Sequence, residues 1–376
     1  MECSPPRAAY IHVPFCVHRC GYCDFTLVAN RDDLIGDYLA ALEIELNSLQ
    51  SACEVDTIFF GGGTPTQLEP AQLRKLLALV NRWFHISPDG EFSTEANPDG
   101  LTQEKVAVLA EGGVNRVSLG VQSFDPAVLE TLERRHLPDD IGVATKRVRH
   151  HISNVSLDLI FGVPGQSIES WDETLAKTIA LKPQHVSTYG LTFEKGTTFW
   201  SRRERGDLVA MHPEIERDMY RRAMQVLPAS GYEQYELSNF AKPDFRCRHN
   251  ETYWAAQPYF AFGPGAARYV DGRRETNHRS VFGWLKRVHA GESPVAEVEE
   301  MTDEDRAREA IVIGLRRTAG VNRQHLLDRF GFTPEQLATA ELQRHIKLGN
   351  LTDNGDQIQL TTEGRYVADS VVMDFL

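Results

Sequence analysis

The first two-thirds of the chain alternates short β-branched and apolar runs with longer amphipathic stretches. The short runs predict six strands, at residues 8–14, 55–60, 91–96, 115–121, 154–161 and 184–191. The stretches between them repeat apolar residues every three or four positions, which predicts helices at residues 33–50, 70–84, 102–111, 125–149 and 168–181. This alternation is typical of right-handed βαβ units around a parallel sheet. Six units favour a barrel, open or closed, and a doubly wound sheet is the alternative.

The pattern changes after residue 195. A single helix is predicted at residues 213–227, and an aromatic-rich stretch follows at 253–269. Beyond the acidic segment EVEEMTDEDR, helices are predicted at residues 303–317, 322–329 and 334–346. Two short strands then flank the turn in NLTDNGDQIQL, and Thr361 caps a last helix at 361–374. Helices followed by a hairpin indicate a small winged-helix-like α+β module.

We therefore expect an α/β protein with three parts. Residues 1–235 form the core barrel, residues 236–300 a connecting segment, and residues 301–376 the winged-helix-like domain. The 376-residue chain holds 40 Lys and Arg against 53 Asp and Glu, a net charge of −13, and has no basic run. This balance opposes a broad nucleic-acid interface, so the C-terminal domain is expected to be a lid or docking element.

The chain also lacks the marks of export and of membrane insertion. Its first residues do not combine a basic segment with an apolar stretch, and no run approaches 18 apolar residues. We expect a cytoplasmic protein without a membrane span. In a reducing compartment, clustered cysteines are metal ligands or catalysts more often than disulfides.

Three of the six cysteines crowd into the segment FCVHRCGYC, directly after the first predicted strand. Cys16, Cys20 and Cys23 have the spacing C-x3-C-x2-C. A zinc site would need a fourth ligand, for which only His18 is near, and a redox dithiol would leave Cys16 unexplained. Thiolates also hold iron–sulfur clusters, and three of them would leave one iron open to a ligand. The pattern favours a 4Fe–4S cluster.

A glycine turn follows the second predicted strand. GGGTP, with Gly62, Gly63 and Thr64, lacks the lysine of a P-loop and the last glycine of a dinucleotide fingerprint. We expect its backbone amides to be open to a small polar ligand. A plain strand-to-helix turn is the alternative.

Polar residues also fall near the carboxyl ends of later predicted strands, where barrel enzymes assemble their sites. They are Glu95, Gln122 and Asp158. A buried acid such as Asp158 is costly unless it is paired, and Arg134 is a candidate partner.

The cysteine motif, with Tyr22 before its last cysteine, resembles the radical S-adenosylmethionine (SAM) superfamily. That resemblance implies a partial TIM-like (β/α)6 barrel, a 4Fe–4S cluster on Cys16, Cys20 and Cys23, an electron donor, and SAM on the open iron. It also implies SAM contacts by the residues that match the motifs of the superfamily: Tyr10, Tyr22, Gly62, Gly63, Thr64, Glu95, Gln122, Arg134, Asp158 and Gly190.

Over nearly its full length the chain resembles the oxygen-independent coproporphyrinogen III oxidase group. The matching segments are YIHVPFC, FFGGGTPT, TEANP, GVQSF, LDLIFGVPGQ and the C-terminal module. The decarboxylases of that group carry a further cysteine where this chain has Phe25, and a longer arm before the motif. Both departures favour the other branch, the haem chaperone (HemW) family.

The segment HNETYW resembles the H-N-x-x-Y-W motif attributed to haem binding in that branch. Its residues are His249, Asn250, Tyr253 and Trp254. An imidazole can ligate haem iron and aromatic rings can line a porphyrin face, while Cys247 is an alternative ligand. A turn-capping histidine beside core aromatics is the structural alternative.

The resemblance implies a haem chaperone that passes haem to an acceptor protein. The alternative is a coproporphyrinogen III oxidase, and turnover of SAM and formation of a homodimer are left open.

Overall fold

A nine-stranded sheet forms the centre of the molecule. The computed structural model describes residues 5–376. Six parallel strands cross the sheet in the order of the sequence. They are β1 (Ala8–Val13), β4 (Cys53–Gly62), β5 (Phe84–Ala96), β6 (Arg116–Gln122), β7 (Asn154–Phe161) and β8 (His185–Gly190). Because this order does not reverse along the six strands, the sheet is a partial barrel and not doubly wound.

Three further strands extend the sheet at its two edges. Strand β11 (Phe260–Phe262) lies parallel to β1, so part of segment 236–300 belongs to the main sheet. Strand β10 (Asn239–Ala241) runs antiparallel to β8, and β9 (Glu233–Gln234) is outermost. The two edge strands β11 and β9 do not pair with each other in the described residues, so the barrel is open.

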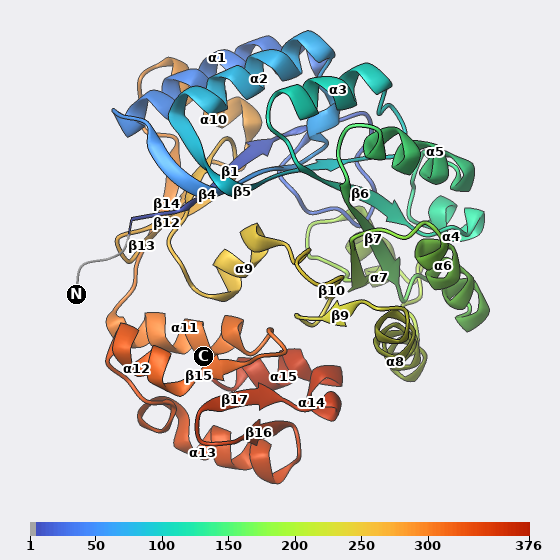
Figure 1. The fold of residues 1–376 in the computed structure, drawn as a ribbon, viewed down its shortest axis with the longest axis vertical. Coiled ribbons are helices and arrows are strands. Elements are labelled where there is room, and N and C mark those ends of the chain that lie inside the picture. Colours follow the sequence, from blue (N-terminus) through green and yellow to red (C-terminus); the bar gives the residue numbers. More distant parts are fainter. Residues whose placement is uncertain (1–4) are drawn as a thin grey trace.

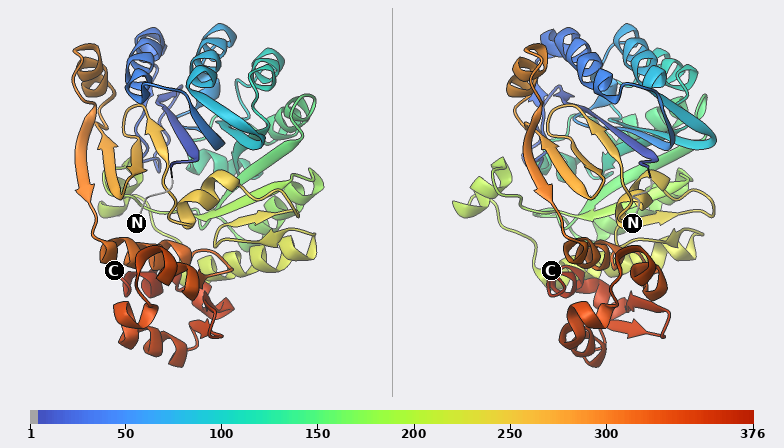
Figure 2. Two further views of the ribbon diagram at one scale, coloured as in Figure 1. Left: turned by 60° about the vertical axis from the view of Figure 1, so that its left-hand side comes forward. Right: turned by 90° about the vertical axis from the view of Figure 1, so that its left-hand side faces the viewer.

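Helices cover the outer side of the sheet (Figure 1). They are α1 (Ile35–Leu46), α2 (Pro70–Trp83), α3 (Gln103–Glu111), α4 (Pro126–Thr131), α5 (Pro138–Arg149), α6 (Ile168–Ala180), α8 (Pro213–Ala229) and α10 (Val281–His289). Figure 2 shows them fanned around the curved sheet. Several begin with proline in their first turn, where its missing N–H costs no helical bond. In residues 5–376, no helix combines the length and apolar character needed to cross a bilayer.

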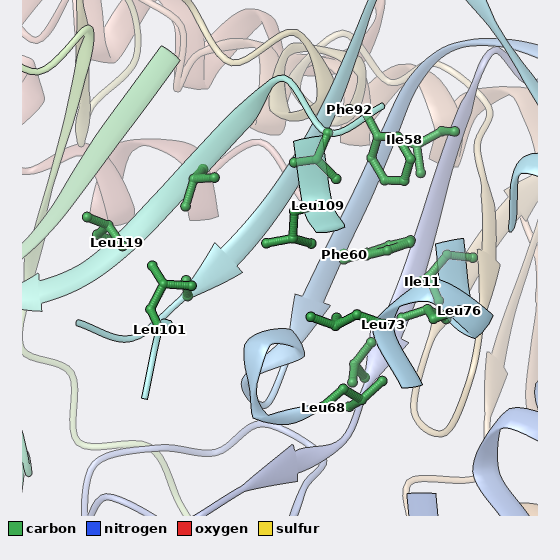
Figure 3. Packing of buried hydrophobic residues seen from close by; sticks show 14 of the residues in the cluster. Ile11, Ile58, Phe60, Leu68, Leu73, Leu76, Phe92, Leu101, Leu109 and Leu119 are labelled. Atoms are coloured by element: carbon green, nitrogen blue, oxygen red, sulfur yellow. The ribbon is translucent and has the colours of Figure 1, made fainter. Parts of the chain in front are cut away.

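The core lies between the helices and the outward-facing strand residues. Phe60 on β4 and Phe92 on β5 meet edge to face, with ring centroids 4.9 Å apart. Leu73, Leu76 and Leu109 project towards them from α2 and α3 (Figure 3). This face buries apolar side chains, so the polar residues that alternate with them point into the barrel.

The helix predicted at 125–149 is wrong as a single element. The structure has α4 and α5 there, separated by a loop. Glu133 in this loop has a left-handed backbone (φ 57°), and Pro138 starts α5 afresh. The loop carries Arg134, so the break places that side chain at the end of the sheet rather than on its outer face.

Elements outside the regular βα units complete the barrel part. They are β2 (Phe15–Cys16), β3 (Val28–Ala29), α7 (Thr198–Glu204), α9 (Arg248–Trp254), and the three-stranded sheet of β12 (Ala267–Val270), β13 (Arg273–Asn277) and β14 (Val295–Glu300). Residues 195–300 are therefore more regular than the pattern indicated.

The C-terminal region is a small α+β unit with its own hydrophobic cluster. It lies at one end of the molecule, in orange and red (Figure 1). Its elements are α11 (Asp303–Gly314), β15 (Val321–Asn322), α12 (Arg323–Phe330), α13 (Pro334–Lys347), β16 (Leu351–Asp353), β17 (Gln357–Leu360), α14 (Thr362–Tyr366) and α15 (Ala368–Met373). The last helix is divided at Val367, although Thr361 caps it as predicted.

Candidate functional site

A cavity of 430 Å³ opens at the carboxyl ends of the parallel strands. The structure brings most of the predicted residues to its lining, from segments far apart in the sequence: Cys16, Cys20, Tyr22, Cys23, Gly62, Gly63, Thr64, Glu95, Gln122, Arg134, Asp158 and Gly190. Tyr10 lies elsewhere, on the lining of a second, smaller cavity.

The cysteine loop is held by bonds to its own backbone. Arg19 donates to the carbonyls of Cys23, Phe25 and Leu27 at 3.3, 3.2 and 2.8 Å. A Cβ on Gly21 would stand 2.4 Å from the ring of Phe199 on α7. Only glycine fits there, so the packing of α7 fixes the loop between the second and third cysteines.

The three thiols face the cavity in different surroundings. Cys16 Sγ lies 3.3 Å from Thr64 Oγ1, and Arg134 Nη1 lies 3.8 Å from Cys20 Sγ. Burial raises the pKa of Cys16 to about 11 and also raises the pKa of Cys23. The thiols of Cys16 and Cys23 are therefore protonated near neutral pH, and a metal must displace those protons to bind.

His18, considered above as a zinc ligand, points to a carboxylate. Its Nε2 lies 3.6 Å from Glu133 Oε2. In residues 5–376, no three His, Cys, Asp or Glu side chains are arranged to surround one metal ion.

The glycine turn has a different role from the one expected. Its amides are not open: Gly62 N donates to Glu95 Oε2 at 3.2 Å, and Gly63 N to Val13 O at 2.9 Å. A Cβ on Gly63 would lie 2.7 Å from the carbonyl oxygen of Phe15. The glycines therefore let β4 approach the start of the cysteine loop closely.

Asp158 does not pair with Arg134, contrary to the proposal from sequence. Its carboxylate accepts hydrogen bonds from Ser118 Oγ at 2.8 Å, Ser187 Oγ at 2.8 Å and Ser156 Oγ at 3.3 Å. Burial raises the pKa of Asp158 despite these bonds. Burial, reinforced by the nearby Asp158, raises the pKa of Glu95 to about 8. Glu95 is consequently protonated at neutral pH.

Arg134 instead links the cavity to the cysteine loop. Its Nη2 donates to Asn97 Oδ1 at 2.6 Å and to Gly120 O at 2.9 Å, and Asn97 donates to Thr64 Oγ1. The buried Nε of Arg134 has no hydrogen-bond partner. An unused donor beside this cavity fits a polar ligand.

Gln122 has a strained backbone at the edge of the same cavity. Its φ is 63°, which glycine adopts more readily, and the pairing of β6 with β7 shifts between Gly120 and Gln122. Such bulges redirect a side chain at the end of a strand, often beside a functional site.

The HNETYW segment forms α9, beneath the inner face of the sheet. His249 is buried and both ring nitrogens are engaged, Nδ1 with Thr57 Oγ1 and Nε2 with Tyr253 OH, each at 2.8 Å. Its ring stacks on Phe59 with centroids 5.1 Å apart. Burial lowers the pKa of His249 to about 3, so the imidazole is neutral. To ligate iron, it would have to give up one of these two bonds.

The other residues of this segment divide between two cavities. Asn250 and Tyr253 line the smaller cavity, of 180 Å³, together with His249. Trp254 lines a separate cavity of 380 Å³ that lies against the C-terminal unit. Cys247 is buried, and its Sγ lies 3.5 Å from Glu91 Oε1; burial raises its pKa to about 12.

Comparisons with known proteins place the chain in a family. The model of the Radical SAM superfamily matches residues 10–178, and that of the HemN C-terminal domain matches residues 301–367. A protein of Bacillus subtilis named "Heme chaperone HemW" is 37% identical over 375 residues, which are 98% of this chain and 99% of the relative. The chain belongs to the HemW family of radical SAM proteins. A protein of the same name from Escherichia coli K12 is 33% identical over 383 residues, 99% and 98% of the two chains.

A solved structure of coproporphyrinogen III oxidase (HemN) from Escherichia coli has the same fold. Its TM-score is 0.86 at 23% identity, and the match covers 99% of this chain and 90% of that one. The predicted partial barrel with a small C-terminal α+β region is thus confirmed.

HemW-family membership within the radical SAM superfamily implies a 4Fe–4S cluster and SAM, and the cavity fits both. Cys16, Cys20 and Cys23 all line it, and a 4Fe–4S cluster takes each thiolate on a different iron, so the three need not surround a single ion. Arg134, whose buried Nε has no hydrogen-bond partner, and the strained Gln122 line the same cavity.

Several lining residues were missed from the sequence. Asn97, Arg116, Ser118, His185 and Ser187 all line one of the two cavities at the centre of the barrel. Four of them sit at alternate positions of β6 and β8, so the polar–apolar alternation of those strands was the available signal.

Proposed function

We propose that the protein is a haem chaperone, which binds haem and transfers it to an acceptor protein. The observation that carries this proposal is the full-length likeness to relatives named "Heme chaperone HemW". The position of Phe25, where the decarboxylases have a further cysteine, also favours it over a coproporphyrinogen III oxidase.

In this proposal Cys16, Cys20 and Cys23 hold a 4Fe–4S cluster, and SAM occupies the cavity behind it. The bound cluster supplies one-electron redox chemistry, for which an electron donor is needed. Arg134 stays charged beside Cys20, which stabilises negative charge on the sulfur. Glu95, Asp158 and Gln122 orient the polar groups of SAM, and the glycine turn fixes the loop against β4.

Haem is proposed to bind near α9. Here His249, Asn250, Tyr253 and Trp254 contribute a neutral imidazole, an amide and two aromatic rings. The hydrogen bond between Tyr253 OH and His249 Nε2 holds the ring without haem, and its release would free Nε2 for iron. We further propose a cytoplasmic location and the formation of a homodimer. The three-part organisation is proposed with one change, that the connecting segment 236–300 contributes β10 and β11 to the main sheet.

An anaerobic haem titration, with and without SAM, tests the proposal. The reconstituted protein should contain roughly four iron and four sulfide per chain, and lose them in Cys20→Ala but not in the control Cys53→Ala. Haem should give a Soret band that survives gel filtration and weakens in His249→Ala. Exposed His289→Ala is the matched control.

Two outcomes would contradict the proposal. One is stoichiometric zinc without iron. The other is conversion of coproporphyrinogen III to its divinyl product with consumption of SAM, which would establish the oxidase instead.

A further inference from the structure

The smaller cavity, of 180 Å³, lies inside the barrel between β6, β8 and α9. It is lined by Tyr10, Phe59, Glu95, Arg116, Ser118, Asp158, His185, Ser187, Tyr189, His249, Asn250 and Tyr253. Four of these residues, Glu95, Ser118, Asp158 and Tyr189, also line the larger cavity. The two spaces are therefore neighbours that share one wall.

Arg116 is the cation of this cavity, and its guanidinium makes no hydrogen bond within the described chain. The side chain is only 2% exposed, and its Nε has no hydrogen-bond partner. Within residues 5–376, no group accepts a hydrogen bond from its other nitrogens either. A buried charge without hydrogen bonds is costly, so this arrangement calls for a partner that the chain itself does not supply.

The nearby acids accept hydrogen bonds from other donors and not from Arg116. Glu91, which is outside the cavity lining, accepts from Ser93 Oγ, Cys247 Sγ and the backbone amides of Arg248 and His249. Burial lowers the pKa of Arg116, but the neighbouring Cys247 and Glu91 raise it further, so the side chain stays protonated. Neither Glu91 nor Asp158 accepts a hydrogen bond from its guanidinium.

The lining holds one carboxylate besides the protonated Glu95, that of Asp158, and its oxygens accept from Ser118, Ser187 and Ser156. Asn250 also has a side-chain amide with no hydrogen-bond partner in the described chain, and it faces the same cavity. Burial lowers the pKa of His185 and His249, so both are neutral, and Glu95 is protonated at pH 7. Arg116 is thus the group that carries a full positive charge here.

We propose that this cavity is a carboxylate-binding subsite, in which Arg116 and Asn250 bind the two oxygens of a small carboxylate. A planar guanidinium matches a carboxylate with two parallel hydrogen bonds. The volume suits a short carboxylate arm, whereas pockets for larger ligands hold roughly 300–1,000 Å³. The carboxylate is either a free small acid or the propionate arm of a porphyrin. Only the second source rests on the proposed haem-chaperone function.

The test uses the full-length protein with its cluster and SAM. Propionate is titrated by calorimetry, and haem and haem dimethyl ester, which lacks free carboxylates, are titrated by absorption. Wild type should bind haem at least about tenfold tighter than the ester, because a buried charge-assisted pair is worth roughly 1.5–3 kcal/mol. Arg116→Gln and Asn250→Ala should each reduce that preference. Arg205→Gln, an exposed arginine, should not.

The outcomes distinguish a free carboxylate from a porphyrin arm, and the failure of the subsite from the failure of the haem-chaperone proposal. A preference for haem over its ester that disappears in Arg116→Gln identifies a porphyrin arm. Propionate binding that depends on Arg116, without such a preference, identifies a free carboxylate. The subsite would be overturned if the wild type showed neither a preference for haem over its ester nor binding of propionate. It would also be overturned if both were unchanged in folded Asn250→Ala and Arg116→Gln proteins. If haem and its ester bound equally well, the proposal of a haem chaperone would still be supported. If propionate bound but haem did not, only the haem-chaperone proposal would be rejected.

Discussion

Gly62 is a position where backbone shape and site geometry depend on one another. Its φ is 110°, a value that side chains with a Cβ rarely adopt, and a Cβ there would lie 2.5 Å from the ring of His12. The His12 ring is itself held between Tyr10 OH and the carbonyl of Thr26, at 3.0 and 2.6 Å. A change at Gly62 would therefore disturb both the cysteine loop and the inner wall of the barrel.

We expect Gly62→Ala to reduce the free energy of unfolding by about 3 kcal/mol, from backbone strain and the clash with His12. Affinity for SAM should fall as well, because Gly62 lines the cavity. Gly142→Ala is the matched control: Gly142 lies inside α5, and a Cβ there meets nothing within 4 Å. That change should stabilise the protein by about 0.5–1 kcal/mol. Urea denaturation and SAM titration measure both effects, and equal effects at the two glycines would refute this account.

Helix α1 is tied to its neighbours at the β11 edge of the sheet by the buried acid Glu45. Glu45 accepts hydrogen bonds from Gly263 N at 2.9 Å, Asn277 Nδ2 at 2.6 Å and Trp284 Nε1 at 3.2 Å. These donors come from the end of β11, from β13 and from α10. Since β11 pairs with β1, this acid fixes the edge of the sheet beside the cysteine loop.

Glu45→Ala should cost about 3–5 kcal/mol, because it leaves three buried donors without an acceptor. The control is Glu43→Ala on the same helix, which removes a partly exposed ion pair with Arg82 at 3.4 Å. That loss should be below about 1 kcal/mol. Denaturant midpoints of the two variants measure the difference. Similar losses would show that the buried acid does not hold this edge.

Backbone hydrogen bonds and an ion pair between buried Glu236 and partly exposed Arg316 help to join the barrel and the C-terminal unit. Leu237 N donates to Arg316 O and Thr318 N to Tyr235 O, both at 3.0 Å. Between them, Glu236 is fully buried and its Oε1 lies 2.7 Å from Arg316 Nη2. Its other oxygen accepts from the amide of Ser238 and the side chain of Asn239. The two units should therefore unfold together.

Glu236→Ala should destabilise the whole molecule by about 3–5 kcal/mol, because the donors that bond to its buried carboxylate would lose their acceptor. In calorimetry, the single transition of the wild type should broaden or divide into two. Glu233→Ala, which removes an exposed pair with Arg246 at 3.5 Å, should leave the transition unchanged. An undivided, unshifted transition in Glu236→Ala would mean that the ion pair does not couple the units.

Local patterns in the chain were enough to predict most of the elements and the candidate chemistry. Period-two and period-3.6 patterns are local, so most strands and helices could be predicted to within a few residues. Strand β5 is an exception, because it begins at Phe84 and not at residue 91. The cysteine spacing and the GGGTP turn are also local, so they identified the segments that line the larger cavity. The break between α4 and α5 was missed because Pro138 and Glu133 act through backbone conformation rather than through hydrophobic period.

Which residues pair, and which polar groups find a hydrogen-bond partner, depends on the folded chain. Asp158 finds three serines from neighbouring strands instead of Arg134, and His249 is held by Thr57 and Tyr253. No group of the described chain accepts a hydrogen bond from the Arg116 guanidinium. Such pairings depend on strand register and on the curvature of the sheet, which bring together residues far apart in sequence. No local pattern encodes that proximity, so only the folded chain reveals where a buried charge is left for a ligand.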